Sequence, residues 1–390
     1  MITYDEALAR VTAAARRLGA EEVTLDSAHG RFLAAPVLAA VDAPPVDVSA
    51  MDGYAVCGTG DAFEILGASY PGTPHEGDIG PGECVRIFTG AAVPAGADRV
   101  VVQEIVDRNA DRALVRKSPA GPDFIRRRGA DFRKGQQLLL AGDRLTPRAL
   151  VVTAGADLGR VSVGKIPRVR VLATGDELVR PGEAHSRQGM IPESVSQGLA
   201  ALIATYGGAC GPGTMVCDDR KETIAAAQTA LSDADLVVVV GGASVGERDF
   251  AKSAFAAMGI ELSFSGVAMR PGRPIWMGSV GETLVMGLPG NPTSAYVTAR
   301  LLLAPLVQGL AGGRSADAVR WRSATLGEGL PGCGSRETFT RAVCRDGVVA
   351  ALPYQDSGAQ LTLASADVLL RQAADSGPLL AGDAVQMLAL

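Results

Sequence analysis

Three glycine-containing segments in the second half of the chain follow apolar runs and carry the residue types that bind anions. They are Thr174–Glu177, Gly241–Gly246 and Gly287–Ser294. At the carboxyl ends of parallel strands, such loops offer backbone N–H groups and helix N-termini to a ligand. Together they predict one site for a phosphate-bearing ligand. For any single loop, a tight turn without a ligand remains the alternative, because none is a Walker loop or a clean dinucleotide fingerprint. The residues expected to contact the ligand are Gly241, Gly242, Ser244, Gly246, Pro289, Gly290, Asn291 and Ser294.

Acidic residues gather at the same predicted strand ends and helix starts: Asp176, Glu177, Asp218, Asp219 and Asp249. Carboxylate oxygens suit Mg²⁺, which usually takes one or two of them together with phosphate oxygens of a substrate. For Asp219 and Asp249, the alternative is that each only caps a helix.

Two arginines, Arg270 and Arg273, flank a Pro-Gly turn in the segment RPGRP. A guanidinium can hold phosphate or another oxyanion through its planar fork of donors. We therefore expect anion binding here, with solvated surface charge as the alternative.

The elements that must position these residues alternate between strand and helix after residue 167. We predict strands at 169–173, 234–240 and 283–286, and helices at 195–206, 220–231, 249–258 and 292–310. This alternation is typical of a mostly parallel sheet with crossover helices. Beyond residue 313, short runs at 338–343, 347–351 and 384–388 predict a small C-terminal β domain.

The first half of the chain has a different pattern. Apolar residues at helical spacing predict a helix over 2–18 that stops at Gly19, and a second helix over 146–158 precedes a short strand at 161–163. We expect the two helices to pack together around an inserted β-rich segment. The strand-like runs of that segment are 63–66, 84–88, 99–102 and 113–115.

The composition limits the class of protein. A chain of 390 residues exceeds the usual domain size, so several domains are expected. The net charge of -5 and a single dense basic run, Arg126–Arg128, argue against a nucleic-acid binder. The six cysteines form no C-x-x-C pair and there are only three histidines, which argues against a disulfide or Cys/His metal site. An acidic start and the lack of a long apolar window predict a cytoplasmic protein without a membrane span.

Six motifs, in this order, resemble those of the molybdopterin molybdenumtransferases, whose relatives include the E domain of gephyrin and of plant cofactor proteins. The resemblance covers nearly the whole chain. The motifs are PPVDVSAMDGYA at 44–55, TGAAVPAGADRVV at 89–101, ATGDEL at 173–178, GGASVGERDF at 241–250, RPGRP at 270–274 and GLPGNPTSA at 287–295.

The resemblance implies a multidomain α/β and β architecture. It consists of a helical linker domain (1–39 plus 137–166), a β-rich inserted domain (40–136), a molybdopterin-binding α/β domain with a mostly parallel sheet (167–313) and a C-terminal β-barrel-like domain (314–390). It also implies a homodimer in which the β-rich domain of one subunit approaches the α/β cleft of the other. A molybdopterin adenylyltransferase is a further expected partner.

The implied reaction starts from adenylylated molybdopterin. Its pyrophosphate bond is cleaved with Mg²⁺, molybdate joins the dithiolene sulfurs, and AMP leaves. Glu177, Asp218 and Asp249 are the implied metal ligands. A non-catalytic molybdopterin-binding paralogue and a tungstate-inserting enzyme remain the alternatives. Carried over by motif, the functional positions are Asp52, Thr89, Asp131, Glu177, Asp218 and Asp249, with Arg270 and Arg273 in the cationic segment.

Two positions depart from the family pattern. The family commonly opens a helix with a Ser-Asn or Thr-Asn pair where this chain reads Pro192-Glu193-Ser194-Val195. Arg273 stands where lysine is frequent, which keeps the charge but changes its hydrogen-bond geometry. These departures leave room for an altered ligand preference.

Overall fold

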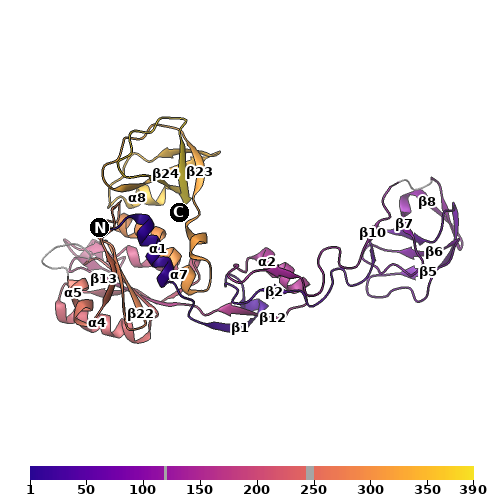
Figure 1. The fold of residues 1–390 in the computed structure, drawn as a ribbon, viewed down its shortest axis with the longest axis horizontal. Coiled ribbons are helices and arrows are strands. Elements are labelled where there is room, and N and C mark those ends of the chain that lie inside the picture. Colours follow the sequence, from indigo (N-terminus) through magenta and orange to yellow (C-terminus); the bar gives the residue numbers. More distant parts are fainter. Residues whose placement is uncertain (118–120, 243–249) are drawn as a thin grey trace.

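The computed structural model describes residues 1–117, 121–242 and 250–390. The molecule is elongated (Figure 1). The α/β sheet and the C-terminal barrel form one end, the β-rich domain forms the other, and a narrow linker joins them. Ser244, Gly246 and Asp249 lie outside the described residues. In the described ranges no helix is both long enough and apolar enough to cross a membrane.

The central sheet has the strand order β16-β13-β18-β22-β21-β19, and β17 also pairs with β13. Every described residue of β18 is buried, which explains why this Leu-Val run takes the middle of a sheet covered on both faces. The predicted parallel strands are confirmed, whereas the antiparallel edge formed by β21 and β19 was not predicted. The bounds are β13 Arg168–Thr174, β16 Ala209–Cys210, β17 Thr214–Val216, β18 Leu236–Val240, β19 Glu261–Ser265, β21 Trp276–Val280 and β22 Thr283–Leu288.

Helices cover both faces of this sheet. α4 (Arg220–Asp233) and α5 (Phe250–Ala257) pack on one face, and α3 (Val195–Thr205) packs on the other. The helix predicted over 292–310 is present as α6 (Pro292–Thr298), a π-helical turn (Ala299–Leu303) and α7 (Ala304–Leu310). Pro305 explains the wide turn, because proline has no N–H to donate to the carbonyl four residues earlier.

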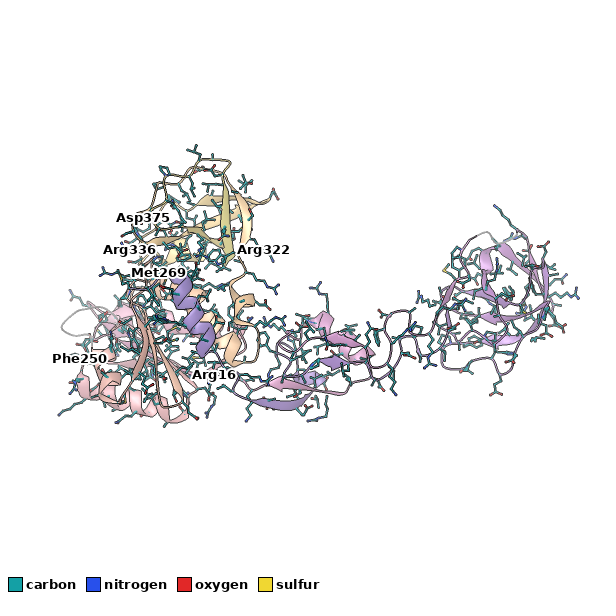
Figure 2. The ribbon with its side chains drawn as sticks, viewed as in Figure 1. Arg16, Phe250, Met269, Arg322, Arg336 and Asp375 are labelled. Atoms are coloured by element: carbon teal, nitrogen blue, oxygen red, sulfur yellow. The ribbon has the colours of Figure 1, made fainter. Side chains whose placement is uncertain are left out.

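The first helix, α1, spans Tyr4–Ala14 and begins with a capping box between Thr3 and Glu6. It buries Tyr4 and Val11 in the core of the α/β domain and lies against α7 (Figure 1). Two predictions were therefore wrong: α1 ends before Gly19, and it packs on α7 and not on the helix of the linker. Its apolar face finds a larger apolar partner there than the short linker helix offers. Arg16 marks where the chain leaves α1 (Figure 2).

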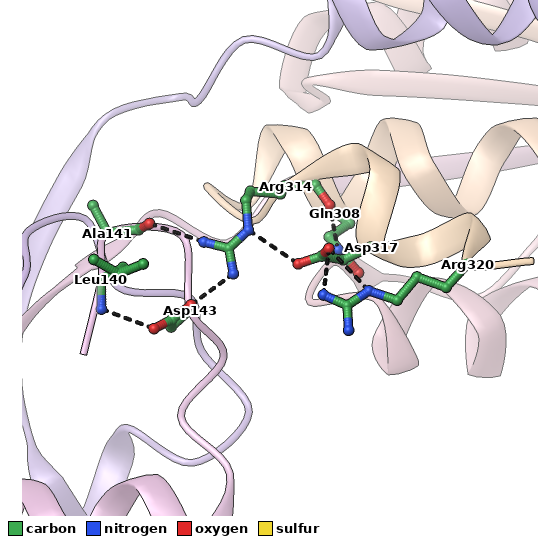
Figure 3. A network of polar contacts seen from close by, with 7 residues as sticks. All are labelled: Leu140, Ala141, Asp143, Gln308, Arg314, Asp317 and Arg320. Atoms are coloured by element: carbon green, nitrogen blue, oxygen red, sulfur yellow. Dashed lines mark hydrogen bonds and ion pairs between the residues drawn. The ribbon is translucent and has the colours of Figure 1, made fainter. Parts of the chain in front are cut away.

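The linker contains α2 (Pro147–Gly155), capped by Thr146, and two short strand pairs. β1 (Ala20–Thr24) pairs with β12 (Arg160–Gly164), and β2 (Val37–Leu38) pairs with β11 (Gln137–Leu139). Arg314, just after α7, donates to the Asp143 carboxylate at 2.6 Å and to the Ala141 carbonyl at 3.3 Å, so it ties the linker to the α/β domain (Figure 3).

The β-rich domain is a six-stranded sheet in the order β7-β4-β6-β5-β9-β8. The four predicted runs are present as β5, β6, β7 and β9, whereas β4, β8 and the strand order were not predicted. The pair β3–β10 lies where the domain joins the linker. The bounds are β3 Val48–Ser49, β4 Gly53–Val56, β5 Ala62–Ser69, β6 Glu83–Ile87, β7 Arg99–Val102, β8 Val106–Asn109, β9 Arg112–Val115 and β10 Ile125–Arg126.

The C-terminal domain is a barrel, because β24 pairs with both β25 and β26 and thereby closes the sheet. β20 (Met269–Arg270) leaves the α/β domain to pair with β24, and Met269 is fully buried near the contact between the two domains (Figure 2). The prediction of a C-terminal β-barrel-like domain is confirmed; β23 and β26 were not predicted. The bounds are β23 Arg322–Leu326, β24 Glu337–Arg345, β25 Val348–Ala351, α8 Gln360–Ala364, β26 Val368–Gln372 and β27 Ala384–Ala389. The remaining short elements are η1 Leu25–Ser27, η2 Gln103–Ile105, β14 Leu178–Val179, η3 Ala184–Ser186, β15 Ile191–Pro192 and η5 Ser315–Val319.

Candidate active site

Three loops meet at the carboxyl edge of the central sheet, because β13, β18 and β22 are parallel neighbours. They surround a cavity of about 780 Å³. The sequence predicted this convergence. The predicted site residues that line the cavity are Glu177, Asp218, Gly241, Gly242, Pro289, Gly290 and Asn291.

Glycines allow the loops to approach one another closely. Gly241 has a φ of +89°, and a Cβ there would lie 2.7 Å from Oγ1 and 2.9 Å from the carbonyl oxygen of Thr174. A Cβ on Gly290 would lie 3.4 Å from the Cα of Gly241, which is ordinary contact. The Gly241 position therefore requires glycine for the fold, whereas the Gly290 position has room for a methyl group.

The acidic residues at this edge divide into two groups. Glu177 and Asp218 line the cavity, and the Asp176 carboxylate accepts a 2.9 Å hydrogen bond from the Asp218 N–H, which joins two loops. Asp219 caps α4 by accepting from the N–H groups of Lys221 and Glu222 at 2.8 and 3.0 Å. The capping interpretation of Asp219 is thereby confirmed.

The structure places other predicted residues away from the cavity wall. Arg270 and Arg273 are exposed, and of that segment only Pro274 lines the cavity. Ser294 is buried within α6 and is not a lining residue. The N–H of Asp131 donates to the Ala43 carbonyl, between the β-rich domain and the linker. Ligand contacts of these four residues stay predictions.

Asp52 and Thr89 form a pair in the β-rich domain. Oδ1 of Asp52 accepts hydrogen bonds from the backbone N–H and from the hydroxyl of Thr89, both at 2.7 Å. These two bonds, the backbone one foremost, hold the pKa of the Asp52 carboxyl below its usual range. The domain that carries the pair lies at the opposite end of the molecule from the cavity (Figure 1).

Three models of known protein families match this chain. It matches the MoeA N-terminal region (domain I and II) over residues 2–156, a probable molybdopterin binding domain over 170–309 and the MoeA C-terminal region (domain IV) over 323–390. Molybdopterin molybdenumtransferase 2 of Mycobacterium tuberculosis is 33% identical over 385 residues, which cover 94% of each chain. The chain belongs to the molybdopterin molybdenumtransferase family.

Two further proteins are similar to this member of the molybdopterin molybdenumtransferase family. The Nostoc molybdopterin molybdenumtransferase is 33% identical, covering 82% of this chain and 76% of its own. A crystal structure of the molybdopterin biosynthesis MoeA protein from Pyrococcus horikoshii is 28% identical with a TM-score of 0.82, covering 100% of this chain and 99% of that one. The four-part fold predicted from the resemblance is thus confirmed.

The C-terminal barrel of this family member also reaches the cavity, which sequence reasoning missed. Gly358 and Gln360 line the cavity. Ser357 accepts a hydrogen bond from the Asn291 side chain at 2.9 Å and, through its carbonyl, from the Thr293 N–H at 3.1 Å. The only signal in the sequence is the turn-forming run Asp356-Ser357-Gly358, which does not identify a site.

A buried glutamate is the second feature that sequence reasoning missed. Glu193 lines the cavity, and its carboxylate accepts from the N–H groups of Val195 and Ser196 at 2.8 and 3.0 Å. The departure from the family pattern at this segment pointed to an altered contact, but not to a carboxylate inside the cavity.

Proposed function

We propose that this chain inserts molybdate into adenylylated molybdopterin and releases AMP, forming molybdenum cofactor. One observation carries the proposal: in a chain of this family, glycine loops and carboxylates line one cavity at the carboxyl edge of the sheet. Backbone N–H groups of Gly242 and Gly290 suit phosphate oxygens, because such donors are fixed before the ligand arrives. We place the reaction in the cytoplasm.

The carboxylates at the cavity suit Mg²⁺. No group of three metal-ligating side chains occurs within the described ranges. Glu177 and Asp218 nevertheless supply the one or two carboxylates that this ion takes when phosphate oxygens complete its coordination, and Asp249 is the proposed third ligand. When bound, Mg²⁺ would neutralise charge on the pyrophosphate. Arg270 and Arg273 are proposed to attract the molybdate and phosphate anions toward this edge.

We further propose a homodimer with shared sites. The Asp52–Thr89 pair lies far from the cavity of its own chain (Figure 1), so it would act at the cavity of a second subunit. Asp131, at the base of the same domain, would support that approach. A molybdopterin adenylyltransferase is the proposed source of the substrate. The division into domains 1–39 plus 137–166, 40–136, 167–313 and 314–390 is proposed as well, with α1 of the first segment packed on the α/β domain.

The test is incubation of the purified protein with adenylylated molybdopterin, Mg²⁺ and molybdate, followed by assays of AMP and of dithiolene-bound metal. We expect AMP and bound molybdenum to increase together, and neither to increase without Mg²⁺. Ligand binding without AMP release would support a storage or delivery protein. Metal incorporation from tungstate but not from molybdate would replace the proposed substrate.

A further inference from the structure

Glu193 adds a third carboxylate to the cavity lining, besides those of Glu177 and Asp218. It is only 7% exposed, and its Oε1 accepts from the first two N–H groups of α3, those of Val195 and Ser196. These are donors that a helix N-terminus would otherwise offer to an anionic ligand. This corner of the cavity is therefore unsuited to phosphate or molybdate.

The second oxygen of Glu193, Oε2, has no hydrogen bond to any other residue in the described ranges. Oε2 is not among the fully buried polar atoms that lack a partner, so it is open to the cavity that Glu193 lines. Because Oε1 is fixed by the helix, Oε2 is held in place as an acceptor. The chemistry that complements it is a group that carries N–H donors.

Apolar side chains lie beside this acceptor. β14 and β15 pair in parallel with Leu178 opposite Ile191, and the Glu193 N–H donates to the Val179 carbonyl at 2.8 Å. Leu178, Ile191 and Pro192 all line the cavity. A flat ring can pack on such side chains while its edge meets the carboxylate. The glycine loops that suit phosphate follow β18 and β22, so the cavity has two chemically different parts.

We propose that Glu193 binds the N–H edge of the pterin ring, accepting hydrogen bonds from its 2-amino and N3–H groups. This assignment rests on the proposed function. The pterin would lie on Leu178, Ile191 and Pro192, and its phosphate arm would extend toward Gly241 and Gly290. Glu193 would then determine which heterocycle enters the site.

The test uses two fluorescent probes that differ at one position, 6-hydroxymethylpterin and 6-hydroxymethyllumazine, whose 2-position carries oxygen in place of the amino group. The full-length wild-type protein should bind the pterin about tenfold more tightly or better, since a charged hydrogen bond is at stake. Glu193→Gln keeps an oxygen for both α3 N–H groups but presents an amide donor to the ring, so the preference should disappear. Glu193→Ser keeps an oxygen that can cap α3 but has no carboxylate, so this variant should lose the preference for the pterin as well.

The matched control is Asp219→Asn, which removes the same charge from a helix cap that does not line the cavity. This variant should keep the wild-type preference for the pterin. No preference in the wild-type protein, or an unchanged preference in both Glu193 variants, would overturn the assignment. AMP release is assayed on the same preparations. Wild-type turnover together with an unchanged preference in the variants refutes only the role of Glu193. A Glu193-dependent pterin preference without AMP release refutes only the proposed function.

Discussion

Thr89 donates two hydrogen bonds to a single oxygen of Asp52, one from its backbone N–H and one from its hydroxyl, both at 2.7 Å. Both bonds favour the charged carboxylate, which is why its pKa is lowered. The pair therefore presents a fixed negative charge on the surface of the β-rich domain.

Thr89→Val removes the hydroxyl donor and leaves the backbone donor in place. We expect the pKa of Asp52 to rise toward its ordinary value without reaching it, as followed by NMR titration of the carboxyl group. Because folding lowers this pKa, the pair stabilises the domain above the unfolded pKa, and this contribution is lost as the pH falls through the folded value. The variant should lose part of that pH dependence. An unchanged Asp52 titration would show that the hydroxyl bond does not form in solution.

The two cavity glycines should respond differently to a methyl group. Gly241→Ala places a side chain at positive φ against Thr174 and should cost about 1 kcal/mol or more of unfolding free energy. Gly290→Ala meets only ordinary contact, so its thermal midpoint should stay at the wild-type value. Its added methyl group should still weaken binding of inorganic pyrophosphate about tenfold or more, as measured by calorimetry. Wild-type affinity in Gly290→Ala would place the phosphate elsewhere.

Two neighbouring aspartates separate metal binding from helix capping. Asp218→Asn should reduce AMP release by at least about tenfold, which is the smallest effect expected when a group that supports a metal site is removed. Asp219→Asn should change neither AMP release nor the thermal midpoint, because asparagine caps a helix about as well as aspartate. The measurement is turnover and thermal midpoint on the same preparations. Equal turnover in the two variants would remove Asp218 from the proposed metal ligands.

Arg314 should control how the linker is held against the α/β domain. It contacts Asp143 and Ala141 across the junction and Asp317 within its own segment (Figure 3). Arg314→Ala should cost about 1 kcal/mol of unfolding free energy, since both side chains of the pair are partly exposed, but should broaden the size distribution in small-angle scattering. The control is Arg320→Ala, because Arg320 bonds only to Asp317 among the described residues. Identical scattering of both variants would mean that Arg314 does not restrain the junction.

The sequence predicted those helices and strands that their own pattern of apolar residues determines. β13, β18 and β22 are apolar runs followed by glycine loops, so both the parallel sheet and the meeting of those loops follow from local pattern. The packing of α1 does not follow from local pattern. Its apolar stripe is compatible with any apolar partner, and its choice of α7 over α2 depends on which surface the whole fold leaves uncovered.

The candidate site was predictable where motifs mark it and not where distant segments meet. Gly358 and Gln360 reach the cavity only because the barrel folds back over α6, where Ser357 bonds to Asn291. The turn-forming run at 356–358 gives no information about that contact. Glu193 was visible as a departure from the family pattern. Its burial and its bond to α3 could be seen only in three dimensions.

We propose above all that one active site is assembled from the Asp52–Thr89 pair of one subunit and the cavity of another. The most direct measurement is AMP release from a one-to-one mixture of Asp52→Ala and Asp218→Ala chains, after subunit exchange has been demonstrated. The mixture should regain about a quarter of wild-type activity, because half of the dimers are mixed and each of these has one intact site. A mixture that has exchanged subunits and remains as inactive as either parent would contradict the shared site.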